Sequence, residues 1–141
     1  MEVWLRRVND AVHFEARNEE QNTVHLDGTP AIGGENLGFR PMQLLLASLA
    51  GCSVLDVVDI LRKQREPLLD VQVRATGNRK PDSTPAPFTD MHLHFLLTGQ
   101  IDPDKAARAV SLAVDKYCSV KESLDKSIQI TYSVEILPPQ A

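Results

Sequence analysis

The first part of the chain alternates between apolar and polar residues in short segments. Alternation with a period of two predicts a half-buried strand. Three such segments lie at residues 3–8, 12–16 and 23–26. Asn9 and Asp10 form a favourable turn pair between the first two segments, and three glycines within residues 33–39 predict a loop. We therefore expect short strands followed by a glycine-rich loop.

A long run of mostly apolar residues follows and predicts one helix over residues 41–65. Pro41 suits the first turn of a helix, where its missing N–H is not needed, and Pro67 marks the end. Leucine and alanine cover most sides of the first half, which is typical of a buried helix, and charged residues appear only in the second half. One chain of this size can hardly cover so much apolar surface. A dimer that covers the helix from both sides is the simplest solution.

Alternation returns in residues 71–77 and 91–98 and predicts two further strands. Prolines between positions 79 and 87 predict the loop that joins them. Asp102 followed by Pro103 is typical of an N-cap and a first helical position, and apolar residues recur at helical spacing from there to Cys118. A second helix is therefore expected to reach Cys118.

A break in this second helix is predicted at Cys118. The residues Ser119-Val120-Lys121-Glu122 fit the capping box S-x-x-E, so a short new helix is expected over residues 120–126, followed by a strand over 128–137. This order of elements is typical of an α+β domain in which antiparallel strands wrap around two helices. The length predicts that residues 1–141 form a single domain.

The composition narrows the class of protein. Hydrophobic residues make up 43% of the chain and charged residues 24%, as in ordinary globular proteins. The net charge is -4 with both signs interspersed, which argues against nucleic acid or an anionic membrane as a partner. The N-terminus lacks the apolar region of a signal peptide, and no apolar stretch approaches the roughly 20 residues that span a bilayer. We therefore expect a cytoplasmic protein.

The chain contains two cysteines, Cys52 and Cys118. In the cytoplasm the reducing thiol pool keeps such residues from forming a permanent structural bridge. They are too far apart in the sequence for a CxxC motif, but they can still meet if the two helices pack face to face. A redox or catalytic pair and two unrelated buried thiols both remain open.

Cys52 lies in the segment LLLASLAGCSVLDVVDIL of the predicted buried helix. A cysteine among leucines is most often a small, inert, buried residue. Its neighbour Gly51 is less usual, since glycine inside a helix is about 1 kcal/mol less favourable than alanine, and it suggests a close approach to the backbone there. A reactive Cys52 needs an arginine or histidine supplied by the fold, and the candidates are Arg17 and Arg40.

Cys118 has the better local environment for a reactive thiol. It directly precedes the predicted N-cap Ser119, so it lies near free N–H groups and the positive end of a helix dipole. That setting lowers the pKa of a thiol. Lys116 and Lys121 are nearby positive charges that can add to the effect.

Other kinds of site have little support. His92 and His94 share one face of a predicted strand opposite three apolar residues, so we expect them to face solvent rather than to bind a metal ion. The sequence has no GxGxxG, P-loop or G-x-S-x-G motif. The glycine loop over residues 33–38 lacks the strand and Lys-Ser/Thr context of a phosphate site. No cofactor is expected.

Two motifs resemble a known family. The run GGENLGFRPMQLLLASLAGCSVLDVVDIL and the downstream KYCSV are similar to the OsmC/Ohr family, the osmotically inducible protein C and organic hydroperoxide resistance proteins. The resemblance covers nearly the whole chain and is closest to the OsmC-like, YhfA-type branch. It implies an intertwined homodimer with antiparallel sheets wrapped around two central helices per chain.

The resemblance also implies a reaction. By position, Cys52 matches the cysteine that attacks a peroxide, and Cys118 matches the cysteine that then closes a disulfide. The implied partners are an organic hydroperoxide or hydrogen peroxide, and a dithiol that reopens the disulfide. The family pattern carries Glu directly after the helix proline, where it supports an active-site Arg, but this chain has Met42 followed by Gln43.

Three functions follow from these observations. The first is a thiol-dependent peroxidase that works through a Cys52 sulfenate and a Cys52–Cys118 disulfide. The second is a non-catalytic dimeric binding module, in which an apolar cleft beside Cys52 holds a small lipophilic or thiol ligand. The third is a structural dimer with two inert buried thiols.

Overall fold

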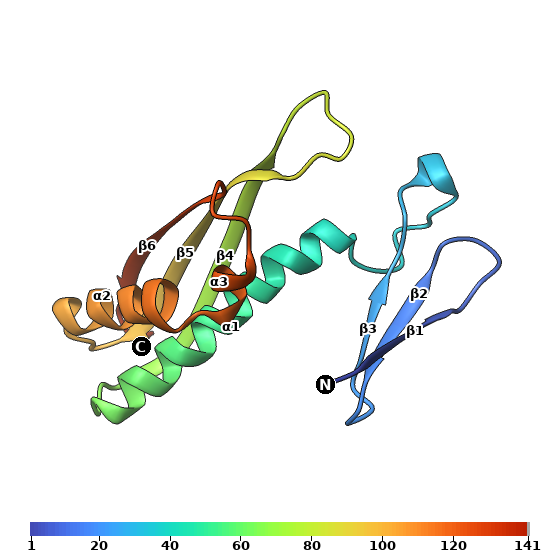
Figure 1. Cartoon of the computed structure of the whole chain (residues 1–141). Coiled ribbons are helices and arrows are strands. Elements are labelled where there is room, and N and C mark those ends of the chain that lie inside the picture. Colours follow the sequence, from blue (N-terminus) through green and yellow to red (C-terminus); the bar gives the residue numbers. More distant parts are fainter. Residues whose placement is uncertain (141) are drawn as a thin grey trace. The chain divides into compact units, whose positions relative to one another are not determined.

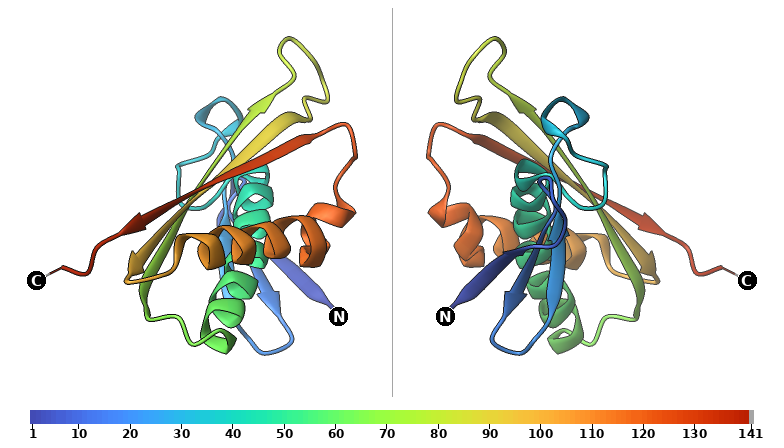
Figure 2. Two further views of the ribbon diagram at one scale, coloured as in Figure 1. Left: turned by 90° about the vertical axis from the view of Figure 1, so that its left-hand side faces the viewer. Right: turned by 90° about the vertical axis from the view of Figure 1, so that its right-hand side faces the viewer.

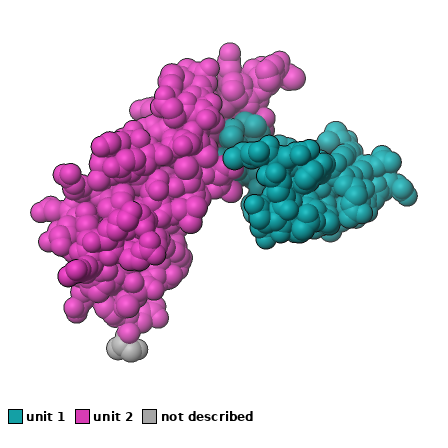
Figure 3. Space-filling model, turned by 60° about the horizontal axis from the view of Figure 1, so that its bottom comes forward, with its two compact units in different colours: residues 1–45 teal, residues 46–141 magenta. Residues whose placement is uncertain are grey.

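The computed structural model describes residues 1–140 and shows an α+β chain (Figure 1). Two compact units can be distinguished, Met1–Leu45 and Leu46–Ala141 (Figure 3). The long helix α1 (Pro41–Lys63) begins in the first unit and continues through the second. The α+β class and the predicted positions of the strands and helices are confirmed, while a single domain over 1–141 stays a prediction.

The first unit contains a three-stranded antiparallel sheet in the order β1-β2-β3. Its strands are β1 (Val3–Arg7), β2 (Phe14–Asn18) and β3 (Thr23–Leu26). A short 3-10 helix, η1 (Pro30–Ile32), interrupts the predicted glycine loop and ends at Gly33. Gly33 has φ 89°, a left-handed conformation that a residue with a Cβ rarely adopts.

This first unit has almost no apolar core. Ala16 and Asp27 are its buried residues, whereas Trp4 is 49% exposed and Phe39 is 48% exposed. The Asp27 carboxylate organises the glycine loop instead. It accepts hydrogen bonds from the backbone N–H groups of Gly28, Glu35 and Leu37 at 2.7, 3.0 and 3.0 Å. These bonds, led by the one from Leu37, lower the pKa of Asp27 against the opposing effect of burial.

The second unit contains a sheet in the order β4-β5-β6. The strands are β4 (Leu68–Arg79), β5 (Phe88–Gly99) and β6 (Gln129–Leu137). β4 and β5 pair antiparallel, but β5 and β6 pair parallel, which differs from the expected antiparallel arrangement. The reason is the helical connection between β5 and β6, which brings the chain back to the same end of the sheet before β6 begins.

That connection consists of three helical segments, which lie with α1 on one side of the sheet (Figure 2). They are α2 (Pro103–Ser111), the π-helix η2 (Leu112–Tyr117) and α3 (Ser119–Ser123). Asp102 caps α2 as predicted, because its carboxylate accepts hydrogen bonds from the N–H groups of Asp104 and Lys105. The predicted helix up to Cys118 therefore exists, but its last part is a π-helix.

The core of the second unit follows from residue periodicity. Alternate residues of β5 are fully buried, namely Met91, Leu93, Phe95 and Leu97. On α1 the fully buried residues recur every four positions, at Leu49, Ser53, Val57 and Leu61. Each large apolar side chain removed from water in this way contributes about 1.5–3 kcal/mol. The second unit can therefore hold its own sheet and helices together.

Much of α1 is only partly covered. Leu55, on the side away from the buried residues, is 72% exposed. The expectation that no apolar stretch is long enough to span a bilayer is wrong, because within residues 1–140 the helix α1 is long and apolar enough by length and composition, with 22% of its apolar window buried. Core helices of other proteins satisfy the same criterion, so this property alone does not place the chain in a membrane.

Candidate thiol site

The structure brings Cys52 and Cys118 together inside the second unit. Cys52 lies on α1 and is half-buried, while Cys118 is 4% exposed and lies where η2 ends and α3 begins. Both cysteines are free thiols. The Cys118 sulfur lies 3.6 Å from the Oγ of Ser53, the residue that follows Cys52, and Cys52 is near enough to raise the pKa of Cys118. Two thiols this close can be oxidised to a disulfide. The sequence alone left open whether they would meet.

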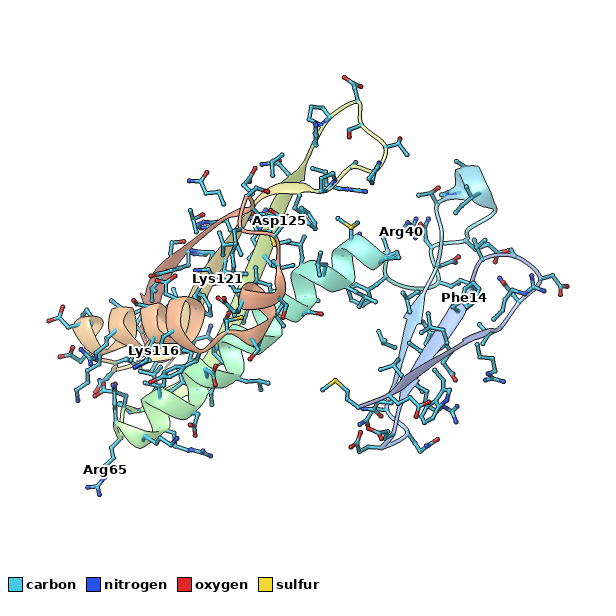
Figure 4. All side chains as sticks on the ribbon, in the orientation of Figure 1. Phe14, Arg40, Arg65, Lys116, Lys121 and Asp125 are labelled. Atoms are coloured by element: carbon cyan, nitrogen blue, oxygen red, sulfur yellow. The ribbon has the colours of Figure 1, made fainter. Side chains whose placement is uncertain are left out.

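The Cys118 sulfur caps α3. Cys118 has extended backbone dihedrals (φ -73°, ψ 101°), and its Sγ accepts a hydrogen bond from the Lys121 backbone N–H at 3.3 Å. The predicted break at Cys118 is confirmed, but the predicted N-cap is wrong by one residue. The N-cap is Cys118, whose thiol accepts the hydrogen bond from the Lys121 N–H, and Ser119 is therefore the first residue of α3. Figure 4 labels Lys121.

The pKa of Cys118 moves in the direction opposite to the prediction. Burial raises it most, because a thiolate loses its hydration inside the protein. The Lys121 N–H and the Ser53 hydroxyl lower it, as hydrogen bonds to a thiolate do, and the nearby Cys52 raises it again. The helix-terminus effect that the sequence predicted is therefore present but is outweighed.

Ser53 is a member of this site that the sequence reasoning missed. It is fully buried on α1, and its Oγ lies 3.0 Å from the Leu49 carbonyl oxygen and 3.6 Å from the Cys118 sulfur. One signal could have revealed it. Ser53 directly follows Cys52 and recurs with Leu49 and Val57 on the buried face, where a polar residue needs a partner.

Gly51 does not behave as predicted. A Cβ built on Gly51 would meet no atom of the described chain within 4 Å, so nothing in residues 1–140 approaches its backbone closely. The expected close approach is therefore wrong within one chain. Glycine at position 51 therefore makes α1 less stable than alanine would, and no contact inside the chain requires it.

The two candidate arginines both have partners in the first unit. Arg17 donates to the Glu15 carboxylate at 2.9 Å and to Gln21 at 3.1 Å. The pKa of Glu15 is lowered mainly by Arg17. Arg40 donates to the Asp27 carbonyl oxygen at 3.2 Å and to the Asn36 side chain, so it stabilises the glycine loop.

The residues after Pro41 serve the start of α1. The Gln43 side-chain oxygen accepts a hydrogen bond from the Arg40 backbone N–H at 2.9 Å. This contact satisfies one of the N–H groups that a helix leaves free at its N-terminus. Gln43 therefore stabilises the helix end rather than a guanidinium, and Met42 beside it is half-buried.

The histidines of β5 belong to a hydrogen-bonded row on the outer face of the second sheet. The row runs Thr131–His92–Ser133–His94–Glu135, with distances of 2.7, 2.9, 2.6 and 3.2 Å. Because a carboxylate only accepts, His94 Nε2 donates to Glu135, and with neutral rings every hydroxyl and ring N–H in the row then donates toward Glu135. Within residues 1–140, no group of three or more His, Cys, Asp or Glu residues is placed to hold a metal ion.

Comparison with known proteins agrees with the resemblance seen in the sequence. Residues 33–133 match the family model described as OsmC-like protein. Protein YhfA of Escherichia coli is 44% identical over 98 residues, which cover 69% of this chain and 72% of YhfA. A hypothetical protein from Aquifex aeolicus has a similar structure, with a TM-score of 0.75, 27% identity and 96% of each chain covered.

A more distant structure carries a descriptive name. It is the organic hydroperoxide resistance protein OsmC, predicted redox protein, from Legionella pneumophila, with a TM-score of 0.67 and 19% identity over 96% of this chain and 97% of that one. At that identity the likeness concerns the fold. The family model covers most of the chain, including both cysteines of the thiol site. The chain belongs to the OsmC-like protein family.

Proposed function

We propose that this protein is a thiol-dependent peroxidase that reduces organic hydroperoxides or hydrogen peroxide. The observation that carries the proposal is that the Cys118 sulfur lies beside α1 in the second unit, 3.6 Å from the Oγ of Ser53, the residue that follows Cys52. Family membership supports the same chemistry, since the Legionella relative in fold is named a hydroperoxide resistance and predicted redox protein.

Burial supports different roles for the two thiols. Cys52 is the more exposed one and so the one that a peroxide can reach, whereas Cys118 is buried and has a raised pKa. The Cys52 thiolate attacks the peroxide, forming an S–O bond and breaking the O–O bond, and the leaving alkoxide or hydroxide takes up a proton and departs as alcohol or water. Cys52 is then a sulfenic acid.

The second step closes the disulfide. The Cys118 sulfur attacks the Cys52 sulfenic acid, the S–S bond forms, and the S–O bond breaks. The leaving hydroxide takes the Cys118 proton and departs as water. A cellular dithiol then reduces the disulfide and restores both thiols. No cofactor takes part in this cycle.

Arg17 and Arg40 stay the two candidates for activating Cys52. The Arg17 guanidinium donates to the Glu15 carboxylate at 2.9 Å, and Arg40 donates to the Asp27 carbonyl oxygen at 3.2 Å. Replacing each arginine by lysine and measuring peroxide reduction, with both variants folded, tests which of them serves Cys52.

A homodimer is part of the proposal. The exposed apolar residues of α1 and of the first sheet need cover, and a second copy of the chain provides it without another partner. The remaining elements of the proposal are a cytoplasmic location and the absence of nucleic acid or membrane partners.

The experiment that tests the function follows peroxide consumption with a dithiol reductant. Cys52→Ser is expected to abolish consumption, while Cys118→Ser leaves a single turnover and an accumulating sulfenic acid. A first sulfenate found on Cys118 by mass spectrometry would exchange the two roles.

The same assay distinguishes the proposed peroxidase from the two alternative functions, a binding module and a structural dimer. No turnover with any hydroperoxide, together with a thermal shift on adding a small lipophilic or thiol ligand, favours the binding module. Thiol counts that stay unchanged after mild peroxide treatment of the native protein favour a structural dimer with inert thiols.

A further inference from the structure

The Ser53 hydroxyl lies between two acceptors in the core of the second unit. Its Oγ is 3.0 Å from the Leu49 carbonyl oxygen, one turn earlier on α1, and 3.6 Å from the Cys118 sulfur. The side chain is fully buried, so no solvent competes for its proton. A hydroxyl has one proton to donate and can accept as well, so it can satisfy either neighbour by rotation.

We propose that Ser53 is a positioning residue of the disulfide-forming step, whose hydroxyl turns its proton from the Leu49 carbonyl to the Cys118 sulfur as that sulfur loses its own proton. The inference rests on the proposed function, in which Cys118 attacks the Cys52 sulfenic acid. It adds a residue that neither the sequence pattern nor the family resemblance assigns.

The two states of Cys118 require different donors. While Cys118 carries its proton, the Ser53 O–H donates to the Leu49 carbonyl, and the thiol S–H is free to donate to the Ser53 oxygen. As the sulfur becomes negative during its attack on Cys52, the Ser53 O–H donates to it instead. The carbonyl that loses its side-chain donor keeps its place as an acceptor in the helix.

Few other groups can stabilise that developing charge. The second donor is the Lys121 backbone N–H at 3.3 Å, and the titratable group that faces Cys118 from α1 is the Cys52 thiol. The nearby charges are used elsewhere. Asp115 on η2 accepts from the Lys121 ammonium at 2.7 Å and from the Tyr132 hydroxyl of β6 at 2.6 Å. Consistent with this, the Ser53 hydrogen bond lowers the pKa of Cys118 against the effect of burial.

A purely structural role makes a different prediction. If Ser53 only bonds to the Leu49 carbonyl, alanine would leave the ionisation of Cys118 unchanged, because that carbonyl already accepts within the helix. If the hydroxyl serves the sulfur, its removal disfavours the thiolate specifically.

The test measures the ionisation of Cys118 directly. In the full-length Cys52→Ser protein, thiolate absorbance is followed against pH with and without Ser53→Ala. We expect Ser53→Ala to move the Cys118 titration upward by about half to one pH unit, the equivalent of one hydrogen bond. Ser119→Ala, which removes an exposed hydroxyl next to Cys118, is the matched control and is expected to leave the titration unchanged.

Two further variants keep the test decisive. Ser53→Thr retains a hydroxyl and is expected to keep the parent titration, and an equal upward shift with Thr and Ala would overturn the proposal by showing a packing effect. Superimposable titrations of the parent and Ser53→Ala would also overturn it. If urea unfolding shows that the alanine variant is not folded, Ser53→Val removes the hydroxyl while matching the shape of threonine.

With both cysteines present, stopped-flow kinetics give a second readout. Ser53→Ala is expected to leave sulfenic acid formation on Cys52 unchanged and to slow disulfide closure about 3- to 10-fold at neutral pH. The titration uses no peroxide, so a failed peroxidase assay and an unshifted titration are separate results. The first rejects the proposed function, and the second rejects the role of Ser53.

Discussion

The two units of this chain are held together by different forces. The second unit buries apolar side chains from β5, α1, α2 and η2, and Phe95 of β5 is fully buried. The first unit, of similar strand count, buries Ala16 and the charged Asp27, and leaves Trp4 about half exposed. A sheet of three strands is stable in water only when one face is covered. The second unit covers its own face, and the first does not.

This difference explains where the thiol site can be built. The contact between Cys118 and Ser53, next to Cys52, needs side chains held in fixed rotamers, and the close-packed second unit supplies them. The first unit holds its loop through the Asp27 carboxylate and keeps its arginines near the surface.

The largest expected effect comes from truncating a buried side chain in the core of the second unit. Phe95→Ala removes a fully buried ring and is expected to lower the free energy of unfolding by about 3–5 kcal/mol, measured by urea denaturation. Trp4→Ala in the first unit, at a 49% exposed position, is the control and is expected to change it by less than about 1 kcal/mol. Equal losses at both sites would contradict the contrast between the units.

A charge placed on the exposed side of α1 tests whether a second copy of the chain packs against that side. Leu55 is 72% exposed, and Leu55→Asp is expected to raise the dissociation constant of the homodimer about a hundredfold, measured by analytical ultracentrifugation. Leu69→Asp, at a 67% exposed position on β4, is the matched control for adding a charge outside α1. A parent protein that sediments as a monomer at all concentrations would reject the dimer.

Acid is expected to loosen the first unit before the second. The pKa of Asp27 is lowered in the folded protein, so its carboxylate stabilises the loop fully above the ordinary aspartate pKa, and the stabilisation is lost as pH falls through the lower folded value. Amide exchange at Glu35 and Leu37, corrected for the intrinsic rate, is expected to stay constant from pH 7 to about 5 and to accelerate about tenfold at lower pH.

Asp27→Asn is the matched control for this acid effect. It keeps the size of the side chain but cannot titrate, so exchange at the two loop amides should become independent of pH. Simultaneous loss of protection in both units as pH falls would show that one cooperative transition, rather than the Asp27 loop, responds to acid.

The smallest expected effect is that of Gly51→Ala, which tests whether a second copy of the chain packs against Gly51. A Cβ at Gly51 meets no atom of the described chain within 4 Å, so in an isolated chain Gly51→Ala is expected to stabilise α1 by about 0.4–1 kcal/mol. Urea denaturation at low and high protein concentration measures this. A destabilisation that appears only at high concentration would place another copy of the chain against Gly51.

Much of the fold could be read from the sequence because each element carries a local signal. The alternation in β4 and β5, Pro41 at the start of α1 and Asp102 at the start of α2 all determine structure within a few residues. The parallel pairing of β5 and β6 could not be read in this way. It depends on how the intervening helices cross the sheet, and the sequence of β6 contains no signal for that crossing.

The candidate site was predictable in part. The two cysteines could be named from the sequence, but their contact and the raised pKa of Cys118 depend on burial, which is a tertiary property. The capping box misplaced the N-cap at Ser119 because thiols seldom cap helices, so the pattern favoured the hydroxyl next to it. Ser53 lacked any local signal beyond its place among apolar residues.

The parallel pairing of β5 and β6 also sets an order of assembly during folding. β4 and β5 are joined by a short loop and can form a hairpin early, whereas β6 can join only after the whole helical connection has closed a much longer loop. Cys52 lies before that hairpin and Cys118 lies inside the late-closing connection. We therefore expect the thiol pair to form late, so that a newly made chain does not have its two cysteines side by side until the native sheet is complete.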